Sequence, residues 1–338
     1  MDVILKVKNI DKNVIDLLEQ NGLELEHILK VAPVILGKTD NPSLLNELPF
    51  VEALEYNELF EPQNIQMMPN IRPNKLKRDN YTGVNSVVAV IDTGIDEDVV
   101  QLLRSEVFSS SMSTRDTRPK NKCHGTIVAR VIRQIAPWSN IINLKVADDN
   151  QEIRTKSILK ALDYAYTNGI KIVNISLGKR GPCSNTCIVC SIINQMYDEG
   201  FAIVVAIGNF GREGQGIISC LATAEKAFAV GAVNPSKHLA DYSSTAPPAY
   251  RKPNILAPGT VMVDGKSPVD GTSFAAPFVT GVVAALSNDF NIQYILNTIE
   301  RTARSIGLPY NQQGHGLIHI EDLLGVIEDE KNATESQR

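Results

Sequence analysis

Five short runs of mostly apolar residues recur between residues 86 and 233, and they limit the folds open to this chain. Helical patterns separate most of the runs, for instance at residues 155–169 and 187–200. A continuous apolar run suits a strand buried on both faces, and strands that alternate with helices favour a parallel sheet. We therefore predict an α/β fold with a mostly parallel central sheet flanked by helices. The predicted strands are residues 86–94, 141–146, 171–178, 201–209 and 227–233.

The first 63 residues follow a different pattern and predict a small separate domain. Their elements follow the order β-α-β-β-α-β, which is typical of a ferredoxin-like α+β domain. A polar stretch rich in Pro and Asn follows at residues 61–83, so we assign 64–326 to the larger domain. The polar residues 327–338 are predicted to be a disordered tail. The expected elements of the small domain are strands at 2–8, two within 25–38, and 51–60, with helices at 11–21 and 41–49.

Composition argues against several classes of partner. The formal net charge is -5 and no Lys/Arg cluster resembles a nucleic-acid footprint, so we predict no nucleic-acid partner. The longest apolar stretch, residues 274–286, contains Pro277 and is too short to span a bilayer, so we predict no membrane segment. The sequence starts "MDVILKVKNIDKNV", which lacks the features of a signal peptide, and its five cysteines make an odd count. These features predict a cytoplasmic protein.

Four polar residues lie at the ends of predicted elements. Asp92 follows the first strand in "AVIDTG", and His124 lies in "CHGTIVARVI", where Gly125 and Thr126 open a predicted helix. Asn209 closes the strand "VVAIGN", and Ser273 opens a predicted helix in "GTSFAAPF". Open α/β sheets bind ligands at the carboxyl ends of their strands, so we expect these side chains to meet there.

These four residue types suit catalysis by an activated serine. A serine hydroxyl is a weak nucleophile until a base takes its proton, and His124 could do that while Asp92 orients the imidazole. A serine at a helix start also has a backbone N–H near a developing oxyanion, and Asn209 could supply a second donor. Pro277 is expected in the first turn or so of that helix, where a missing N–H is tolerated.

The motifs "AVIDTGID", "HGTIVA", "NISLG", "AIGN" and "GTSFAAPFV", in this order, resemble those of the subtilisin-like serine peptidases. The resemblance runs over about residues 81–325. It implies a serine endopeptidase whose triad is Asp92, His124 and Ser273, with Asn209 as the oxyanion donor. The partner it implies is a peptide or protein substrate.

The same resemblance implies a binding groove for an extended peptide. The segment Ser176, Leu177 and Gly178 resembles the edge strand against which the family lays its substrate. The segment from Ala147 and Asp148 to Gln151 is expected to form the opposite rim. Residues 208–220, beginning at Gly208, would border the pocket for the side chain before the scissile bond, with Cys220 near its floor.

Residues 1–63 resemble the family's propeptide, which implies a proenzyme whose own N-terminal domain is an intramolecular inhibitor. The inhibitory tail would lie within Glu58–Gln66. Cleavage at Gln63–Asn64 is one interpretation, and the absence of any cut is another. The substrate range could be broad, or narrow as in the maturation of a leader peptide. A non-catalytic peptide-binding regulator kept shut by residues 1–63 is the alternative function.

We predict no cofactor and no metal site. The calcium-binding loop that many secreted members carry after the catalytic histidine has no room between His124 and the next strand. Cys183, Cys187 and Cys190 follow the pattern C-x3-C-x2-C, which leaves open a metal site, a disulfide or packed reduced thiols. Reduced thiols are favoured because zinc sites usually have four ligands in tighter pairs.

Overall fold

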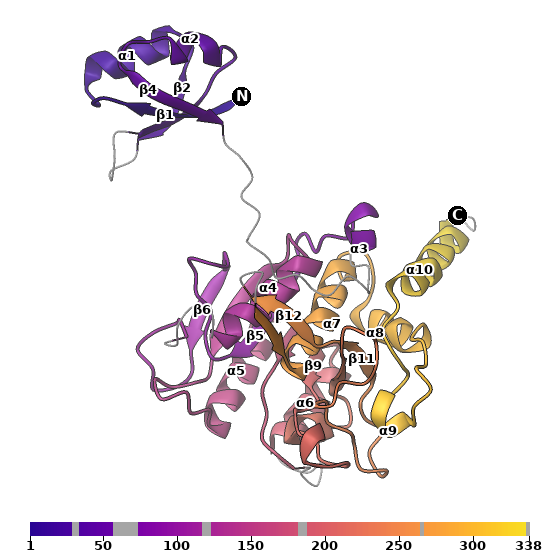
Figure 1. Ribbon diagram of the computed structural model, residues 1–338. Coiled ribbons are helices and arrows are strands. Elements are labelled where there is room, and N and C mark those ends of the chain that lie inside the picture. Colours follow the sequence, from indigo (N-terminus) through magenta and orange to yellow (C-terminus); the bar gives the residue numbers. More distant parts are fainter. Residues whose placement is uncertain (29–33, 57–73, 117–122, 182–187, 264–266, 336–338) are drawn as a thin grey trace. The chain divides into compact units, whose positions relative to one another are not determined.

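The computed structural model describes residues 1–28, 34–56, 74–116, 123–181, 188–263 and 267–335. The chain divides into two compact units (Figure 1), which are Met1–Glu61, here called unit 1, and Pro62–Arg338, here called unit 2. The predicted boundary after residue 63 and the Gln63–Asn64 bond lie outside the described residues.

Unit 1 is an α+β domain with the element order that the sequence predicts. Its four strands form an antiparallel sheet in the order β2-β3-β1-β4, and α1 begins after Asp11, whose side chain accepts a hydrogen bond from the backbone N–H of Val14. Apolar side chains from both strands and helices form its core, among them Leu5, Leu18 and Leu45. The elements are β1 (Asp2–Val7), α1 (Lys12–Gln20), β2 (Glu24–Ile28), β3 (Val34–Lys38), α2 (Pro42–Asn46) and β4 (Val51–Tyr56).

Unit 2 is built on a seven-stranded sheet whose strands all run parallel, in the order β11-β10-β9-β8-β5-β7-β6. This confirms the predicted fold class. The strands are β5 (Val87–Asp92), β6 (Arg104–Val107), β7 (Asn140–Lys145), β8 (Ile172–Ile175), β9 (Ala202–Ala206), β10 (Phe228–Val233) and β11 (Ile255–Pro258).

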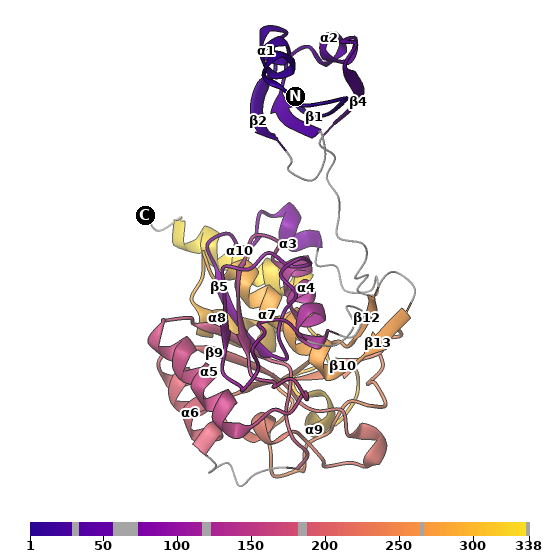
Figure 2. The same ribbon diagram turned by 90° about the vertical axis from the view of Figure 1, so that its left-hand side faces the viewer.

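Helices cover both faces of this sheet (Figure 2). Along β5, Val88 and Val90 join the core under α4 (His124–Ile135) and α7 (Thr272–Leu286). Ala89 and Ile91, which alternate with them along the strand, join the core under α5 (Thr155–Thr167) and α6 (Ile188–Asp198). Successive side chains of a strand point to opposite faces, so burial on both faces makes the strand apolar throughout.

The first strand of the sheet, β5, lies at the point where the strand order reverses. The chain passes from β5 to β6 and back to β7 on one side, and then crosses to β8 on the other side of β5. Crevices for ligands form outside the carboxyl ends of strands at such a point. Asp92, the last residue of β5, therefore marks the expected location of a site.

Two strands of the sheet were not predicted from the sequence. Strand β6 reads "RSEV" and is an edge strand, so it lacks a continuous apolar run. Strand β11 reads "ILAP" and is also at an edge, where a proline is tolerated. A separate antiparallel pair consists of β12 (Thr260–Val263) and β13 (Ser267–Asp270).

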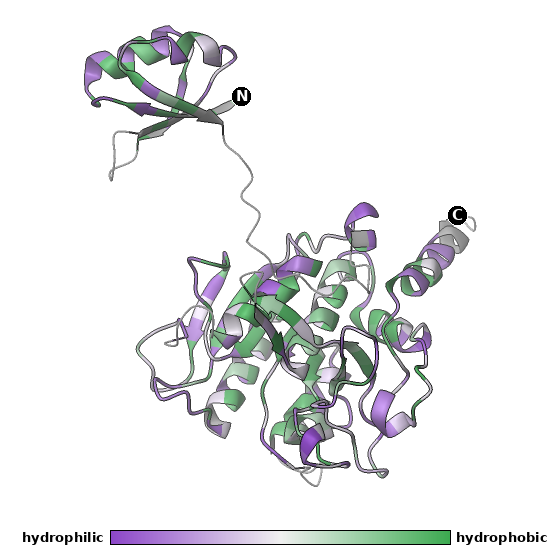
Figure 3. Ribbon diagram, in the orientation of Figure 1, coloured by the Kyte–Doolittle hydropathy of each residue, from purple (hydrophilic) through white to green (hydrophobic). Residues whose placement is uncertain are grey.

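Helix α7 runs through the centre of unit 2, and in Figure 3 it is largely green like the strands beside it. Nearly every residue of α7 is buried, which explains its long apolar sequence. The position of Pro277 differs from the prediction, because α7 begins at Thr272 and the proline is its sixth residue. Pro277 has no N–H to donate to the carbonyl of Ser273, its i−4 partner. The helix therefore lacks this hydrogen bond, which a proline in the first turn would not have cost.

The disordered tail predicted over residues 327–338 is wrong as far as Glu335, because α10 (Ile320–Glu335) continues to that residue. Ile327 is fully buried in the core of unit 2, and the carboxylate of Glu328 lies 3.7 Å from the ammonium of Lys75. Burial of one side of the helix thus extends order into a polar sequence. None of the described helices is both long and apolar enough to cross a membrane. The remaining helices are α3 (Asn74–Arg78), η2 (Gly211–Glu213), η3 (Cys220–Thr223), α8 (Ile292–Arg301) and α9 (Tyr310–Gln313).

Candidate active site

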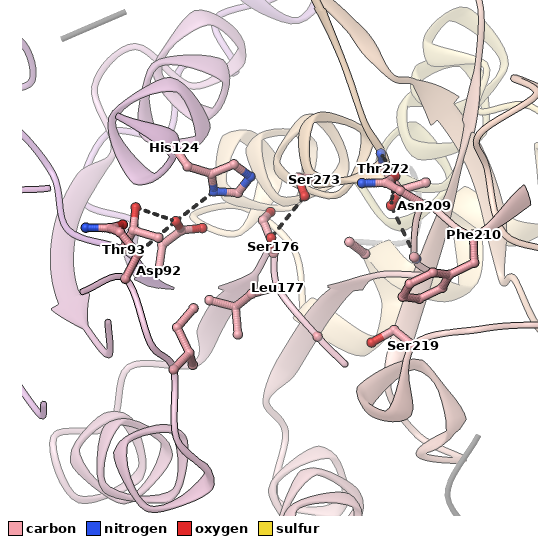
Figure 4. Close-up of a pocket in the computed structure, with 15 residues that line it drawn as sticks. Asp92, Thr93, His124, Ser176, Leu177, Asn209, Phe210, Ser219, Thr272 and Ser273 are labelled. Carbon is pink, nitrogen blue, oxygen red and sulfur yellow. Dashed lines mark hydrogen bonds and ion pairs between the residues drawn. The ribbon is translucent and has the colours of Figure 1, made fainter. Parts of the chain in front are cut away.

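Asp92 and His124 are joined by a hydrogen bond at the carboxyl end of β5. The Asp92 side chain is fully buried, whereas the His124 side chain is 25% exposed. Nδ1 of His124 lies 2.8 Å from Oδ1 of Asp92, and Figure 4 shows the imidazole between Asp92 and Ser273. The carboxylate favours the proton on Nδ1, which leaves Nε2 on the side of Ser273 as a hydrogen-bond acceptor.

The start of α4 is fixed by its contact with the turn after β5. A Cβ on Gly125 would lie 2.5 Å from the carbonyl oxygen of Gly94, so only glycine allows this approach. The Gly125 N–H donates to Oγ1 of Thr93 at 3.1 Å, and the His124 N–H donates to Oδ2 of Asp116 at 3.2 Å. Side chains thus satisfy the first N–H groups of the helix and hold His124 at its end.

Thr93 connects the two buried carboxylates beside His124. Its backbone N–H donates to Oδ1 of Asp92 at 2.7 Å, and its hydroxyl donates to Oδ2 of Asp116 at 2.6 Å. Sequence reasoning missed both Thr93 and Asp116. The "DTG" motif could have identified Thr93, whereas nothing in the sequence around Asp116 indicates its contact with the site.

Lys145 anchors the loop that carries Asp116. It is the last residue of β7 and the register partner of Asp92, and it is fully buried. Its ammonium donates to the carbonyl oxygen of Arg115 at 2.5 Å. Burial lowers the pKa of Lys145, while the carboxylates of Asp149, Asp116 and Asp148 act in the opposite direction.

Ser273 is the second residue of α7 and directly follows the Gly271–Thr272 step. Its Oγ donates to the carbonyl oxygen of Ser176 at 3.0 Å, just beyond the end of β8. Inside the core, the Thr280 hydroxyl donates to Oδ1 of Asn174 at 2.9 Å. This second link, made two residues before Ser176, fixes α7 against β8 and so positions Ser273.

Asn209 follows β9 and is held by Thr272. Its Oδ1 accepts hydrogen bonds from the backbone N–H of Thr272 at 2.9 Å and from the Thr272 hydroxyl at 3.0 Å. Gly208 N–H in turn donates to the Thr272 hydroxyl at 3.3 Å. Because the oxygen of the amide is taken by two donors, the Asn209 NH₂ group is oriented as a donor.

These side chains line one cleft of about 380 Å³. It brings together eight of the residues that the sequence predicts: Asp92, His124, Ser176, Leu177, Gly178, Gly208, Asn209 and Ser273. Gln151, Phe210 and Ser219 also line it, and they fall within the segments 147–151 and 208–220 that the sequence predicts. Sequence reasoning missed the other lining residues, which are Thr93, Ile153, Ala206 and Thr272.

Ala147 and Asp148 do not line the cleft, contrary to the prediction. Ala147 is fully buried and pairs with Ile153, and the Asp148 carboxylate accepts from the backbone N–H groups of Asn150 and Glu152. Asp148 therefore closes the turn of this loop. The rim of the cleft is formed by Gln151, the last residue of the predicted segment, and by Ile153, which lies just beyond it.

The structure describes three of the five cysteines, and all three are buried. Cys220 does not itself line the cleft, but it directly follows the lining residue Ser219. Sγ of Cys190 lies 3.6 Å from the carbonyl oxygen of Cys220. Cys183 and Cys187 lie outside the described residues, and among the residues that are described no three His, Cys, Asp or Glu side chains form a cluster fit for a metal ion.

Relatives of known identity share most of this chain. Subtilisin DY of Bacillus licheniformis is 28% identical over 272 residues, which cover 75% of this chain and 96% of the relative. Subtilisin E of Bacillus subtilis (strain 168) is 27% identical over 332 residues, which cover 90% of this chain and 84% of the relative.

Two solved structures share the fold. The prenylagaramide maturation protease PagA has a TM-score of 0.61 at 23% identity, with coverage of 76% of this chain and 98% of that one. MycP1 with its N-terminal propeptide removed has a TM-score of 0.60 at 21% identity, with coverage of 76% and 96%. The model of the subtilase family matches residues 83–316. This chain therefore belongs to the subtilase family and is a subtilisin-like serine endopeptidase.

Proposed function

We propose that Asp92, His124 and Ser273 form the catalytic triad of this peptidase and that Asn209 is its oxyanion donor. The observation that carries the proposal is the order of side chains along the cleft. The imidazole of His124 is oriented by a buried carboxylate on one side and faces the Ser273 hydroxyl on the other.

Catalysis begins with a rotation of the Ser273 side chain. Its hydroxyl leaves the Ser176 carbonyl and donates to Nε2 of His124, and its Oγ then attacks the carbonyl carbon of the scissile bond while the proton passes to Nε2. The negative oxygen accepts from the Asn209 NH₂ group and from the backbone N–H of Ser273, which has no intrahelical partner at this helix position.

The cycle closes with the loss of two products. The proton on Nε2 passes to the leaving amine as the C–N bond breaks, which leaves an acyl ester on Ser273. A water molecule then attacks the ester carbon and gives a proton to Nε2. The bond between this carbon and Oγ of Ser273 breaks, Oγ takes the proton back from Nε2, and the acid product leaves. Asp92 stays ionised and stabilises the imidazolium in both halves.

The substrate backbone pairs with the segment Ser176 to Gly178, which continues β8 along the cleft. Recognition of this kind uses main-chain hydrogen bonds and gives affinity without strong sequence choice. Gln151 and Ile153 provide the opposite rim.

A serine-reactive phosphonate tests the triad. We expect wild type to be labelled and to hydrolyse casein, and we expect Ser273→Ala and His124→Ala to lose both properties. The alternative, a peptide-binding regulator without catalysis, predicts no labelling and no hydrolysis by wild type even after proteolytic removal of unit 1.

We further propose that unit 1 is an inhibitory propeptide, removed at or near Gln63–Asn64. The alignment with subtilisin E covers more of the chain than unit 2 contains, so it extends into unit 1. Intact mass of wild type beside Ser273→Ala tests self-processing. A mass loss in wild type alone is expected, and equal masses after prolonged incubation would contradict it.

The proposal also covers the breadth of the substrate range and the location of the protein in the cell. The narrower range, a role in leader-peptide maturation, is supported by the fold shared with PagA, which is itself a maturation protease. Digestion of denatured proteins distinguishes the two ranges, since a narrow enzyme would leave most of them intact. A cytoplasmic location stays a prediction from the cysteine count.

A further inference from the structure

The part of the cleft beyond Asn209 ends at the side chain of Ser219. Its Oγ lies so close to the backbone of Gly178 that a Cβ on that glycine would be 1.8 Å away. Figure 4 shows the Ser219 side chain and the Phe210 ring on one side of this space and Leu177 on the other. Ser219 therefore closes the space where the side chain before the scissile bond would enter.

The Ser219 hydroxyl is buried and has no hydrogen-bond partner among the described residues. Ser219 is 2% exposed, and only its backbone is engaged, by donation to the Ile207 carbonyl and acceptance from the Ala222 N–H. A buried polar group without a partner costs free energy, and the cost is recovered when a ligand supplies the missing hydrogen bond.

The surroundings of this hydroxyl do not suit a charged ligand. Leu177, Ala206 and the Phe210 ring supply apolar walls, and Phe210 packs 3.0 Å from where a Cβ on Gly208 would be. Among the described lining residues Asp92 alone carries a fixed charge, and it is bound to His124. A charged side chain placed beside Ser219 would be desolvated without a counter-ion.

We propose that Ser219 makes this peptidase select an uncharged side chain with a hydrogen-bonding group, a hydroxyl or a carboxamide, at the residue before the cleaved bond. This inference rests on the proposed function and names the specificity of the same site. A single hydroxyl can both donate to a carboxamide oxygen and accept from its NH₂, so Thr, Ser, Asn and Gln all satisfy it.

Isosteric substrate pairs test the proposal with the full chain. The probes are acetyl-Ala-Ala-Ala-Xaa 4-nitroanilides in which Xaa is Thr or Val, and Asn or Leu. The members of each pair have the same number of side-chain heavy atoms and the same branching, so the ratio of kcat/KM within a pair reports the hydrogen bond. Because both members see the same enzyme sample, the ratio is independent of how much enzyme unit 1 inhibits. We expect Thr over Val and Asn over Leu by about tenfold.

Two substitutions locate the cause. Ser219→Ala removes the hydroxyl with little change of shape, and we expect both ratios to fall to about one. Ser219→Gly removes the contact with Gly178, and we expect kcat/KM for a Phe substrate to rise about tenfold relative to Val. Ser236→Ala, at an exposed serine, is the matched control and should keep the wild-type ratios.

The outcomes separate the two proposals. Ratios near one in wild type, with cleavage that requires Ser273, would overturn the role of Ser219 and leave the triad standing. Ratios that persist in Ser219→Ala would overturn it as well. No cleavage of any peptide, together with no phosphonate labelling, would refute the proposed function and this inference with it.

Discussion

The residues next to Asp92 and Ser273 in the chain hold these reacting groups in place. Thr93 follows Asp92 and Thr272 precedes Ser273, and each contributes both a backbone N–H and a hydroxyl to the network of the site. The sequence predicted the reacting residues because their types define the chemistry. It could not predict Asp116, because the contact of its carboxylate with the first N–H of α4 depends on the tertiary fold and not on a local pattern.

Thr93→Val should lower catalysis without unfolding the protein. The valine keeps the volume but removes the hydroxyl that joins Asp116 to the N-terminus of α4, so His124 is held less firmly. We expect kcat to fall about tenfold with a smaller change in KM, because small misplacements of a reacting group are costly. Peptide hydrolysis measures this, and Thr167→Val, at an exposed helix residue, is the control. Wild-type kcat in Thr93→Val would refute this role.

Secondary-structure elements were predictable where burial alone shapes them. The strands buried on both faces appear in the sequence as apolar runs, and β7, β9 and β10 were predicted within one to three residues. Strand β6 is at an edge and residues 329–331 of α10 are exposed, so local sequence says little about either. Their structure depends on tertiary contacts.

Thr280→Val should weaken the attachment of α7 to β8 and so lower the stability of unit 2. The substitution removes the donor to Oδ1 of the fully buried Asn174 and leaves that oxygen without it. We expect a loss of about 1–3 kcal/mol in the free energy of unfolding, measured by urea titration in a Ser273→Ala background that prevents autolysis.

A matched control for Thr280 lies in the next helix. Thr298 is equally buried, but its hydroxyl donates only within α8, to the carbonyl of Tyr294. Thr298→Val should therefore cost less than Thr280→Val. Equal losses for the two variants would show that the link between helix and strand has no special weight.

At the scale of the whole molecule, the chain consists of two units with separate cores. The change from one hydrophobic pattern to another made this division predictable. The stability of unit 2 should also depend on pH through Lys252, a buried lysine that donates to the carbonyls of Glu225 and Ala227 and to Oδ1 of Asn254.

Burial lowers the pKa of Lys252 from 10.5 to about 8, and this predicts that stability rises with pH. Between these values the unfolded chain binds more protons than the folded one, so raising the pH favours the folded state. We expect a gain of about 2 kcal/mol in unfolding free energy from pH 7 to 9.5, relative to Lys252→Met. Urea titrations in the Ser273→Ala background measure it, and parallel pH profiles for the two proteins would contradict it.

The most direct test of the triad is the site at which a phosphonate reacts. The full chain is incubated with the reagent, digested with trypsin and mapped by tandem mass spectrometry. We predict one adduct, on Ser273, which disappears in His124→Ala although Ser273 is still present. Labelling on any other serine, or equal labelling of Ser273 when His124 is absent, would contradict a hydroxyl activated by this imidazole.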